Sequence, residues 1–352
     1  MKRILYSKSP DARAAFVKSY FEKSGAGKIA YLAPRKFIAD VSGRRLPQAS
    51  FHAYEDVIKS NTLFNEVDGE TLLVFDRPSR YKLITSNTFV RLSRIAARYE
   101  RKIMVDIVPF TTGIEYLYTP LAFIDRRILN YQHWYSFREN NLEITETGES
   151  VRAHDYNLLA GKLAPHVKID YESFLENQTH VVERPMPGEE RAEYQALRDR
   201  LFAENRTAGP IITTLADWTN IRPGRYETLK DLLSGLQGKS IVYTNLASHN
   251  RRLKKEIGGG DRSIGGNIEI KSFYDTNGDE SRYDNVILFE VPIVRNYLFL
   301  DVIANIRPDC HVHIFRSDVT VDRYLFKKMD DEYTAINEFT KTLHKAVKEY
   351  EN

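Results

Sequence analysis

The chain alternates short, uniformly apolar segments with amphipathic helical segments, and this rhythm constrains its fold more than any other feature. Thr71–Phe75 (TLLVF) is apolar at nearly every position rather than at every second one. That pattern indicates a strand buried on both faces, as in a parallel sheet covered by helices. Strands are predicted at Arg3–Tyr6, Lys28–Leu32, Thr71–Phe75, Lys102–Val108, Ser240–Tyr243, Asn285–Phe289 and Val312–Phe315. Helices are predicted at Asp11–Phe21, Thr88–Tyr99, Glu189–Phe202, Tyr226–Leu236, Ser248–Ile257, Val321–Met329 and Asp331–Tyr350. The sequence therefore predicts an α/β protein with parallel sheets.

The rhythm is interrupted in the middle of the chain, where apolar residues are sparse and follow a helical spacing. The length of 352 residues is about twice that of a typical domain, so two domains are expected. We expect one α/β lobe at 1–125, a helical connecting segment at 126–205 and a second α/β lobe at 206–352.

Charge and cysteine content exclude several classes of protein. Lys and Arg number 51 and Asp and Glu 48, a net charge of +3, which excludes a histone-like polyanion binder and leaves a local basic groove open. The single cysteine, Cys310, excludes a disulfide framework and a thiolate metal cluster. No apolar run is long enough to span a bilayer. We therefore expect a cytoplasmic protein without a membrane partner.

Segments spread over nearly the whole chain resemble, in their order, the motifs of superfamily 2 helicases, most closely those of the Swi/Snf-like branch. These segments are Ile29–Arg35 (motif Ia), Leu72–Asp76 (motif II), Lys102–Val108 with Tyr116–Ile124 (motif III), His166–Val182 with Met186 and Glu189–Leu197 (the linker), Lys239–Asn245 (motif IV), Asn277–Pro292 (motif V) and Val312–Arg316 with Thr320–Asp322 (after motif VI). The resemblance implies two RecA-like lobes, ATP and Mg²⁺ as cofactors of an active member, and double-stranded DNA as the partner.

The phosphate-binding loop of that family is missing from its expected place. Such a loop is rich in glycine, which lets backbone N–H groups cradle phosphates, and it ends in Lys-Thr. Here the first strand is followed by Ser7–Arg13, which contains no glycine and has Asp11 where phosphate should lie. Gly25–Lys28 contains the right letters but precedes a strand and is followed by Ile29, so a turn between helix and strand is the favoured interpretation.

Two further catalytic elements depart from the family pattern. Motif II retains Asp76, the remnant of a metal site, but Arg77 stands where a water-orienting glutamate belongs. At motif VI, Asn305 stands where an arginine belongs and Arg307 remains nearby. Because three independent elements are altered, the resemblance implies a pseudo-enzyme that binds no cofactor.

The motifs that contact DNA in the family fit better than the catalytic ones. The resemblance carries nucleic-acid contacts over to Arg35, Lys36, Thr244, Asn245, Gly278 and Arg307. Further cations are scattered along the chain, among them Arg251, Arg252, Lys254 and Lys255. Because the chain also contains 48 acidic residues, a solvated surface of mixed charge is an equally good interpretation of these cations.

Cys310, His311 and His313 form a weaker candidate, for a metal. On a strand, positions 311 and 313 share a face while 310 points away, so histidines packed or paired across strands are the favoured interpretation.

Three functions remain open. The first is an ATPase-deficient helicase-like accessory factor that binds DNA or joins a protein complex; its compact length, with few insertions, would suit a viral or phage protein acting in the host cytoplasm. The second is an active ATP-dependent double-stranded DNA translocase with divergent motifs. The third is a protein scaffold that binds no nucleic acid.

Overall fold

The chain divides into two compact α/β units, each built on its own parallel sheet. The computed structural model describes residues 2–61, 63, 69–81, 86–144, 150–173, 178–204, 207–245, 247–258, 267–276, 280–292 and 297–352. Unit 1 comprises Met1–Phe174 and Glu332–Asn352, and unit 2 comprises Leu175–Asp331. The expected pair of parallel-sheet α/β lobes is confirmed.

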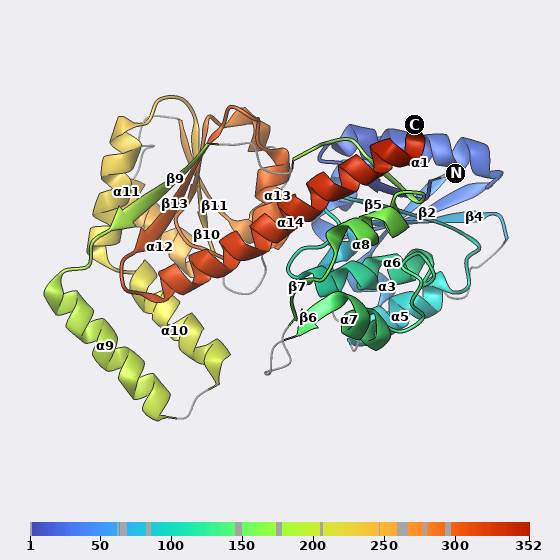
Figure 1. Ribbon diagram of the computed structural model, residues 1–352. Coiled ribbons are helices and arrows are strands. Elements are labelled where there is room, and N and C mark those ends of the chain that lie inside the picture. The colour runs from blue at the N-terminus through green and yellow to red at the C-terminus, as the bar shows by residue number, and fades with distance from the viewer. Residues whose placement is uncertain are drawn as a thin grey trace. The chain divides into compact units, whose positions relative to one another are not determined.

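Unit 1 contains a six-stranded parallel sheet in the order β3-β2-β4-β5-β1-β8 (Figure 1). Its strands are β1 (Ile4–Tyr6), β2 (Lys28–Ala33), β3 (Ala49–Ala53), β4 (Thr71–Asp76), β5 (Arg101–Asp106) and β8 (Val167–Ile169), and an antiparallel pair is formed by β6 (Leu142–Ile144) and β7 (Ser150–Ala153). Its helices are α1 (Pro10–Ser24), α2 (Ile38–Ser42), α3 (Tyr54–Val57), α5 (Asn87–Ala96), α6 (Tyr118–Ile124), α7 (Trp134–Asn141) and α8 (Tyr156–Leu163).

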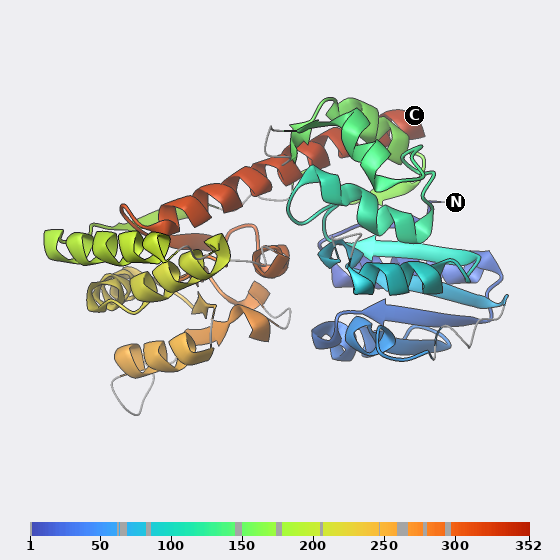
Figure 2. The ribbon, with the colours of Figure 1, turned by 90° about the horizontal axis from the view of Figure 1, so that it is seen from below.

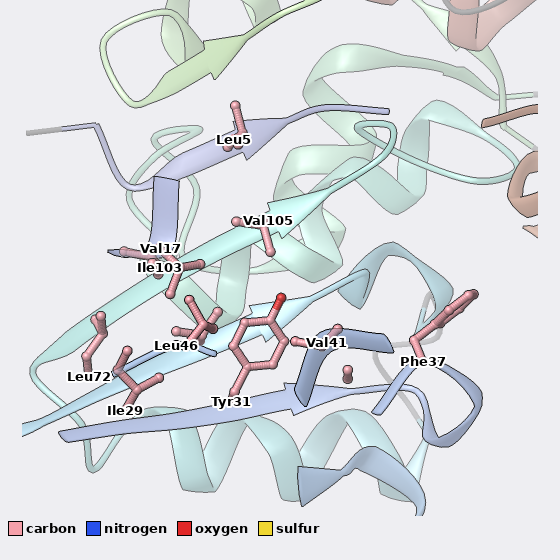
Figure 3. Close-up of a cluster of buried hydrophobic side chains, with 12 residues drawn as sticks. Leu5, Val17, Ile29, Tyr31, Phe37, Val41, Leu46, Leu72, Ile103 and Val105 are labelled. Atoms are coloured by element: carbon pink, nitrogen blue, oxygen red, sulfur yellow. The ribbon is translucent and has the colours of Figure 1, made fainter. Parts of the chain in front are cut away.

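Both faces of this sheet are covered, as the uniformly apolar strands require. Figure 3 shows the core on one face, where Val17 of α1 and Val41 of α2 pack on side chains of β2, β4 and β5. On the other face, the ring of Phe75 stacks on Phe123 of α6, with centroids 5.2 Å apart, and Phe89 of α5 packs against Phe123. Alternate residues of β4 therefore serve two separate cores.

Unit 2 contains a five-stranded parallel sheet in the order β11-β10-β12-β13-β9. Figure 2 shows this unit turned by 90° from the view of Figure 1. Its strands are β9 (Thr179–Arg184), β10 (Ser240–Thr244), β11 (Ile268–Ser272), β12 (Asn285–Leu288) and β13 (His311–Ser317). Its helices are α9 (Gly188–Ala203), α10 (Ala208–Asn220), α11 (Pro223–Gly235), α12 (Ala247–Gly258) and α13 (Tyr297–Asn305), and α14 (Val321–Glu351) contributes to both units. The helices predicted separately at Val321–Met329 and Asp331–Tyr350 form this one continuous helix, α14.

The middle of the chain differs from the expected helical connecting segment at 126–205. It supplies β8 to the first sheet and β9 to the second, so the unit boundary falls near residue 174 rather than at 125 and 205. The physical reason is that both are edge strands. Five of the six residues of β9, written THVVER, are exposed or half-exposed, so the strand lacks the apolar run by which a buried strand is recognised.

No helix among the described residues combines the length and apolar character needed to cross a membrane.

Candidate functional site

Acidic side chains gather at the carboxyl edge of the unit 1 sheet, where parallel α/β sheets bind ligands. Asp76 is the last residue of β4 and Asp106 the last residue of the neighbouring β5, and both are buried. Asp170 follows β8 and accepts a hydrogen bond from the Ser7 hydroxyl, which follows β1, at 2.5 Å. The sequence identified Asp76 here, whereas Asp106 lay inside a predicted strand and was not singled out.

The connection between β1 and α1 is a three-residue turn. The N-cap of α1 is Ser9, whose hydroxyl accepts a hydrogen bond from the Ala12 amide at 3.2 Å, and Pro10 begins the helix. The Ser7 hydroxyl accepts from the Ser9 amide at 3.1 Å. Two amides that could face a phosphate are therefore used within the turn itself.

Arg13 completes this turn from the first helical turn of α1. Its side chain is buried, and its Nη1 donates to the carbonyl oxygens of Ser7 and Lys8 at 2.6 and 3.1 Å. A loop that cradles phosphate presents N–H groups to its ligand. Here the turn presents the carbonyl oxygens of Ser7 and Lys8 to the Arg13 guanidinium. Carbonyl oxygens attract a cation and repel the oxygens of a phosphate. The role of Arg13 was missed at the level of sequence, although the residue lies within the stretch Ser7–Arg13.

Asp76 is enclosed by groups of the protein. Its Oδ2 accepts a hydrogen bond from the Tyr31 hydroxyl at 3.1 Å, and its Oδ1 lies 3.8 Å from Arg13 Nε and 3.9 Å from Arg77 Nε. The Arg77 guanidinium lies 3.4 Å from the centroid of the Phe37 ring, a cation–π contact. The carboxyl group of Asp76 is thus surrounded by one tyrosine and two arginines of the protein.

The second buried carboxyl, Asp106, has an unusual acidity. Burial raises its pKa from 3.8 to about 6, although hydrogen bonds from the amides of Ser79 and Ile107 lower it. The charge of Asp76 contributes to this rise. At this edge of the sheet, Asp106 is therefore a carboxyl group that accepts a proton at a higher pH than an ordinary aspartate does.

The residues expected to contact DNA at motif Ia lie among acidic neighbours. Arg35 Nη2 pairs with the Asp56 carboxylate, and the Arg35 amide donates to Glu55 Oε2 at 3.1 Å. Lys36 Nζ lies 4.8 Å from the centroid of the Phe37 ring. Both cations are thus engaged within unit 1, which leaves less of their charge for a phosphate.

The residues expected to contact DNA in unit 2 are placed in three different ways. Thr244, at the end of β10, is fully buried. Asn245 is half-buried, with its amide donating to Glu290 Oε2 at 2.6 Å and its Nδ2 to the Val291 carbonyl at 2.9 Å. Arg307 pairs with Asp284 at 2.6 Å. The structure therefore does not bring these side chains together on one surface with free cationic groups, and Gly278 lies outside the described residues.

Asn305, expected to replace a catalytic arginine, is the last residue of α13. Its Nδ2 donates to the Asp301 carbonyl at 2.6 Å within the same helix. The amide group therefore serves its own helix end.

The carboxyl edge of the unit 2 sheet holds a buried Glu–His pair that the sequence did not reveal. Glu290 is fully buried and its Oε1 lies 2.6 Å from His249 Nδ1, while Asp217 Oδ1 lies 3.7 Å from His249 Nε2. The hydrogen bond to Glu290 raises the pKa of His249, against the effect of burial. His249 therefore links α12 to Asp217 of α10 and to Glu290 in the segment after β12.

Three histidines meet on the neighbouring strands β9 and β13. His313 is opposite His180 in the register, with ring centroids 5.0 Å apart, and His180 Nε2 lies 3.1 Å from His311 Nδ1. Among the described residues, no group of three or more His, Cys, Asp or Glu side chains is arranged to hold a metal ion. The arrangement consists of histidines paired across two neighbouring strands. This is the interpretation that the sequence favoured.

The buried member of this cluster predicts sensitivity to acid. Burial, together with the neighbouring His180 and His311, lowers the pKa of His313 from 6.5 to about 4. Below pH 6.5 the unfolded chain binds a proton that the folded chain refuses until about pH 4, so the free energy of unfolding should fall between these values. The loss is at most about 3 kcal/mol. Urea titrations at pH 7.5 and 5.0 should show a smaller loss for His313→Gln than for the wild type; equal losses would contradict the prediction.

Comparisons with known proteins identify structures but no family. No family model matches the sequence, and no curated protein matches it. One similar solved structure is the Sulfolobus solfataricus SWI2/SNF2 ATPase core in complex with double-stranded DNA, at 12% identity and a TM-score of 0.42, covering 98% of this chain and 90% of that chain. The ATPase core domain from the same organism is 11% identical with a TM-score of 0.42, covering 96% and 85%. The Pyrococcus furiosus Hef helicase domain is 11% identical with a TM-score of 0.45, covering 93% and 94%. Each of these three structures is similar to the chain over most of its length.

Proposed function

We propose that this chain is a helicase-like protein that does not hydrolyse ATP and acts as an accessory factor by binding double-stranded DNA. The lack of ATP hydrolysis is supported by Arg13, which closes the β1–α1 turn. Its guanidinium donates hydrogen bonds to the Ser7 and Lys8 carbonyls and lies 3.8 Å from Asp76. A nucleotide phosphate would have to displace this cation from a buried carboxylate. Because the two lobes contain few insertions, the proposal extends to a viral or phage protein that acts in the host cytoplasm.

An ATPase assay with and without duplex DNA tests the lack of hydrolysis. We expect a turnover rate at least about 10³-fold below that of an active helicase core measured in parallel, because the parts that position and neutralise the transferred phosphoryl group are replaced. Fluorescent ATP analogues should also fail to bind. Hydrolysis that is stimulated by DNA and lost in Asp76→Asn would instead establish the active translocase, provided that the variant keeps the circular dichroism spectrum of the wild type.

DNA binding is tested by the dependence of affinity on salt. Each phosphate that a cation neutralises contributes about 0.9 to the slope of log affinity against log salt concentration. We expect a steep slope that is the same for unrelated duplex sequences. The variant carrying Arg35→Ala and Lys36→Ala should lower the slope by at most about two units, and by less if their contacts with Asp56 and Phe37 persist in the complex.

A protein scaffold without nucleic-acid binding is the second candidate. The ion pairs of Arg35 with Asp56 and of Arg307 with Asp284 favour it, because both cations are already neutralised. Absence of duplex binding even at low salt would select this function.

A further inference from the structure

Helix α12 (Ala247–Gly258) presents a row of cations on the side opposite its core contacts. Leu253 and Ile257 are buried in the unit 2 core, where the helix packs beside β10 and α11 (Figure 1). With 3.6 residues per turn, Arg251 and Lys255 lie on the opposite side, one turn apart, and Arg252 flanks them. All three side chains belong to exposed residues.

These cations differ from those that the motifs singled out. Within the described part of the chain, Arg251, Arg252, Lys254 and Lys255 form no ion pair, and the contact recorded for Arg252 is with the Tyr226 ring, 5.7 Å from its centroid. Arg35 and Arg307, by contrast, both pair with carboxylates. The one acidic residue among positions 251–256 is Glu256. Among the described residues, positive charge is therefore concentrated on this face without a carboxylate that pairs with it.

We propose that the face of α12 formed by Arg251, Arg252, Lys254 and Lys255 binds the phosphate backbone of double-stranded DNA. The proposal rests on the proposed function and names its contact surface. Duplex DNA carries one negative charge per about 1.7 Å of its axis, so cations about 6 Å apart along a helix can each reach a phosphate. Lysine and arginine contacts to phosphate fix position and carry no sequence information, so all duplex sequences should bind alike.

Other polyanions fit this face less well. A helix that binds a membrane surface inserts its apolar side, whereas the apolar side of α12 is already buried with Leu253 and Ile257. Proteins that hold single strands stack bases on aromatic rings. The outward positions of α12 carry no aromatic ring. In its sequence, ASHNRRLKKEIG, the one aromatic side chain is that of His249, which is half-buried. The backbone of a duplex needs only an unneutralised row of cations.

The test compares two triple variants that remove the same charge. Arg251→Gln, Arg252→Gln and Lys255→Gln neutralise the α12 face. Arg323→Gln, Lys327→Gln and Lys328→Gln neutralise three exposed cations of α14 that are followed by Asp330 and Asp331. Fluorescence anisotropy with two unrelated 20-base-pair duplexes is measured between about 50 and 300 mM KCl, at which each phosphate contact contributes about 0.9 to the salt slope. Circular dichroism and Tm establish that both variants are folded.

We expect the α12 variant to lose affinity on the order of 10²-fold at 0.1 M salt, with a salt slope lower by two to three units at about 0.9 per contact. The α14 variant should lose less than about a third of that slope. Equal losses in the two variants would indicate a general charge effect and overturn the assignment. So would wild-type binding to poly-glutamate or anionic vesicles as tight as to duplex DNA.

Failure of this inference can be told apart from failure of the proposed function. If the wild type binds duplex DNA and the α12 variant binds equally well, the contact surface is wrong and the function stands. If the wild type binds no duplex at low salt, both are overturned.

Discussion

Replacement of Arg13 by alanine is expected to lower the free energy of unfolding by about 3–5 kcal/mol, because it removes one of the two guanidinium groups beside the buried carboxyl group of Asp76. Arg13 and Asp76 are 3% and 1% exposed, so water cannot take the place of the guanidinium. The carbonyls of Ser7 and Lys8 would also lose their donor. Arg77, whose Nε lies 3.9 Å from Asp76 Oδ1, remains beside the carboxyl group in this variant.

Urea denaturation can follow unit 1 by itself, because the protein has two tryptophans and Trp134 lies in unit 1 while Trp218 lies in unit 2. In a Trp218→Phe background, fluorescence reports on Trp134. The matched control combines Arg13→Met with Asp76→Asn, which removes both charges and should regain at least half of the lost stability. If Arg13→Ala lowers the free energy of unfolding by less than about 1 kcal/mol, the interaction of Arg13 with Asp76 does not stabilise the buried carboxyl group in the way proposed.

Replacement of Arg225 by alanine is expected to destabilise unit 2 by a similar amount, about 3–5 kcal/mol. Arg225 is fully buried; its Nη1 donates to Ser317 Oγ at 2.9 Å and to Asp322 Oδ2 at 2.5 Å, and its Nη2 donates to the Phe289 carbonyl. One guanidinium thus joins α11, the ends of β12 and β13, and the first turn of α14. Its removal leaves the carboxylate of Asp322, 3% exposed, without a cation.

Trp218 fluorescence in a Trp134→Phe background measures this effect in unit 2. Arg225→Lys should fall between the wild type and the alanine variant, because an ammonium keeps the charge but cannot reproduce the planar set of donors. Lys230→Ala, at an exposed position of the same helix, is the control and should change stability by less than about 0.5 kcal/mol. An Arg225→Ala variant as stable as that control would refute the role assigned to the guanidinium.

Much of the architecture could be predicted because buried strands reveal themselves by composition. The run TLLVF of β4 is apolar on both faces, and the strand is fully buried in the sheet. The position of Asp76 followed from the same pattern, since a residue at the end of such a strand lies at the carboxyl edge of the sheet. The division of the middle segment could not be predicted, because β8 has only three residues and β9 is largely exposed. Both are edge strands that pair with one neighbour each, β1 and β13.

The chemistry of the site depended on contacts between residues distant in sequence. The absence of glycine from Ser7–Arg13 was visible in the letters, but the contact of Arg13 with Asp76 joins positions 63 apart, and that of Arg35 with Asp56 joins positions 21 apart. Likewise, the cations of α12 are visible in the sequence, whereas it is the structure that shows them without a carboxylate partner among the described residues. Hydrophobic periodicity is a local property that the chain carries along its length, whereas neutralisation of a charge depends on which side chains folding brings within a few ångströms, and only the tertiary structure decides that.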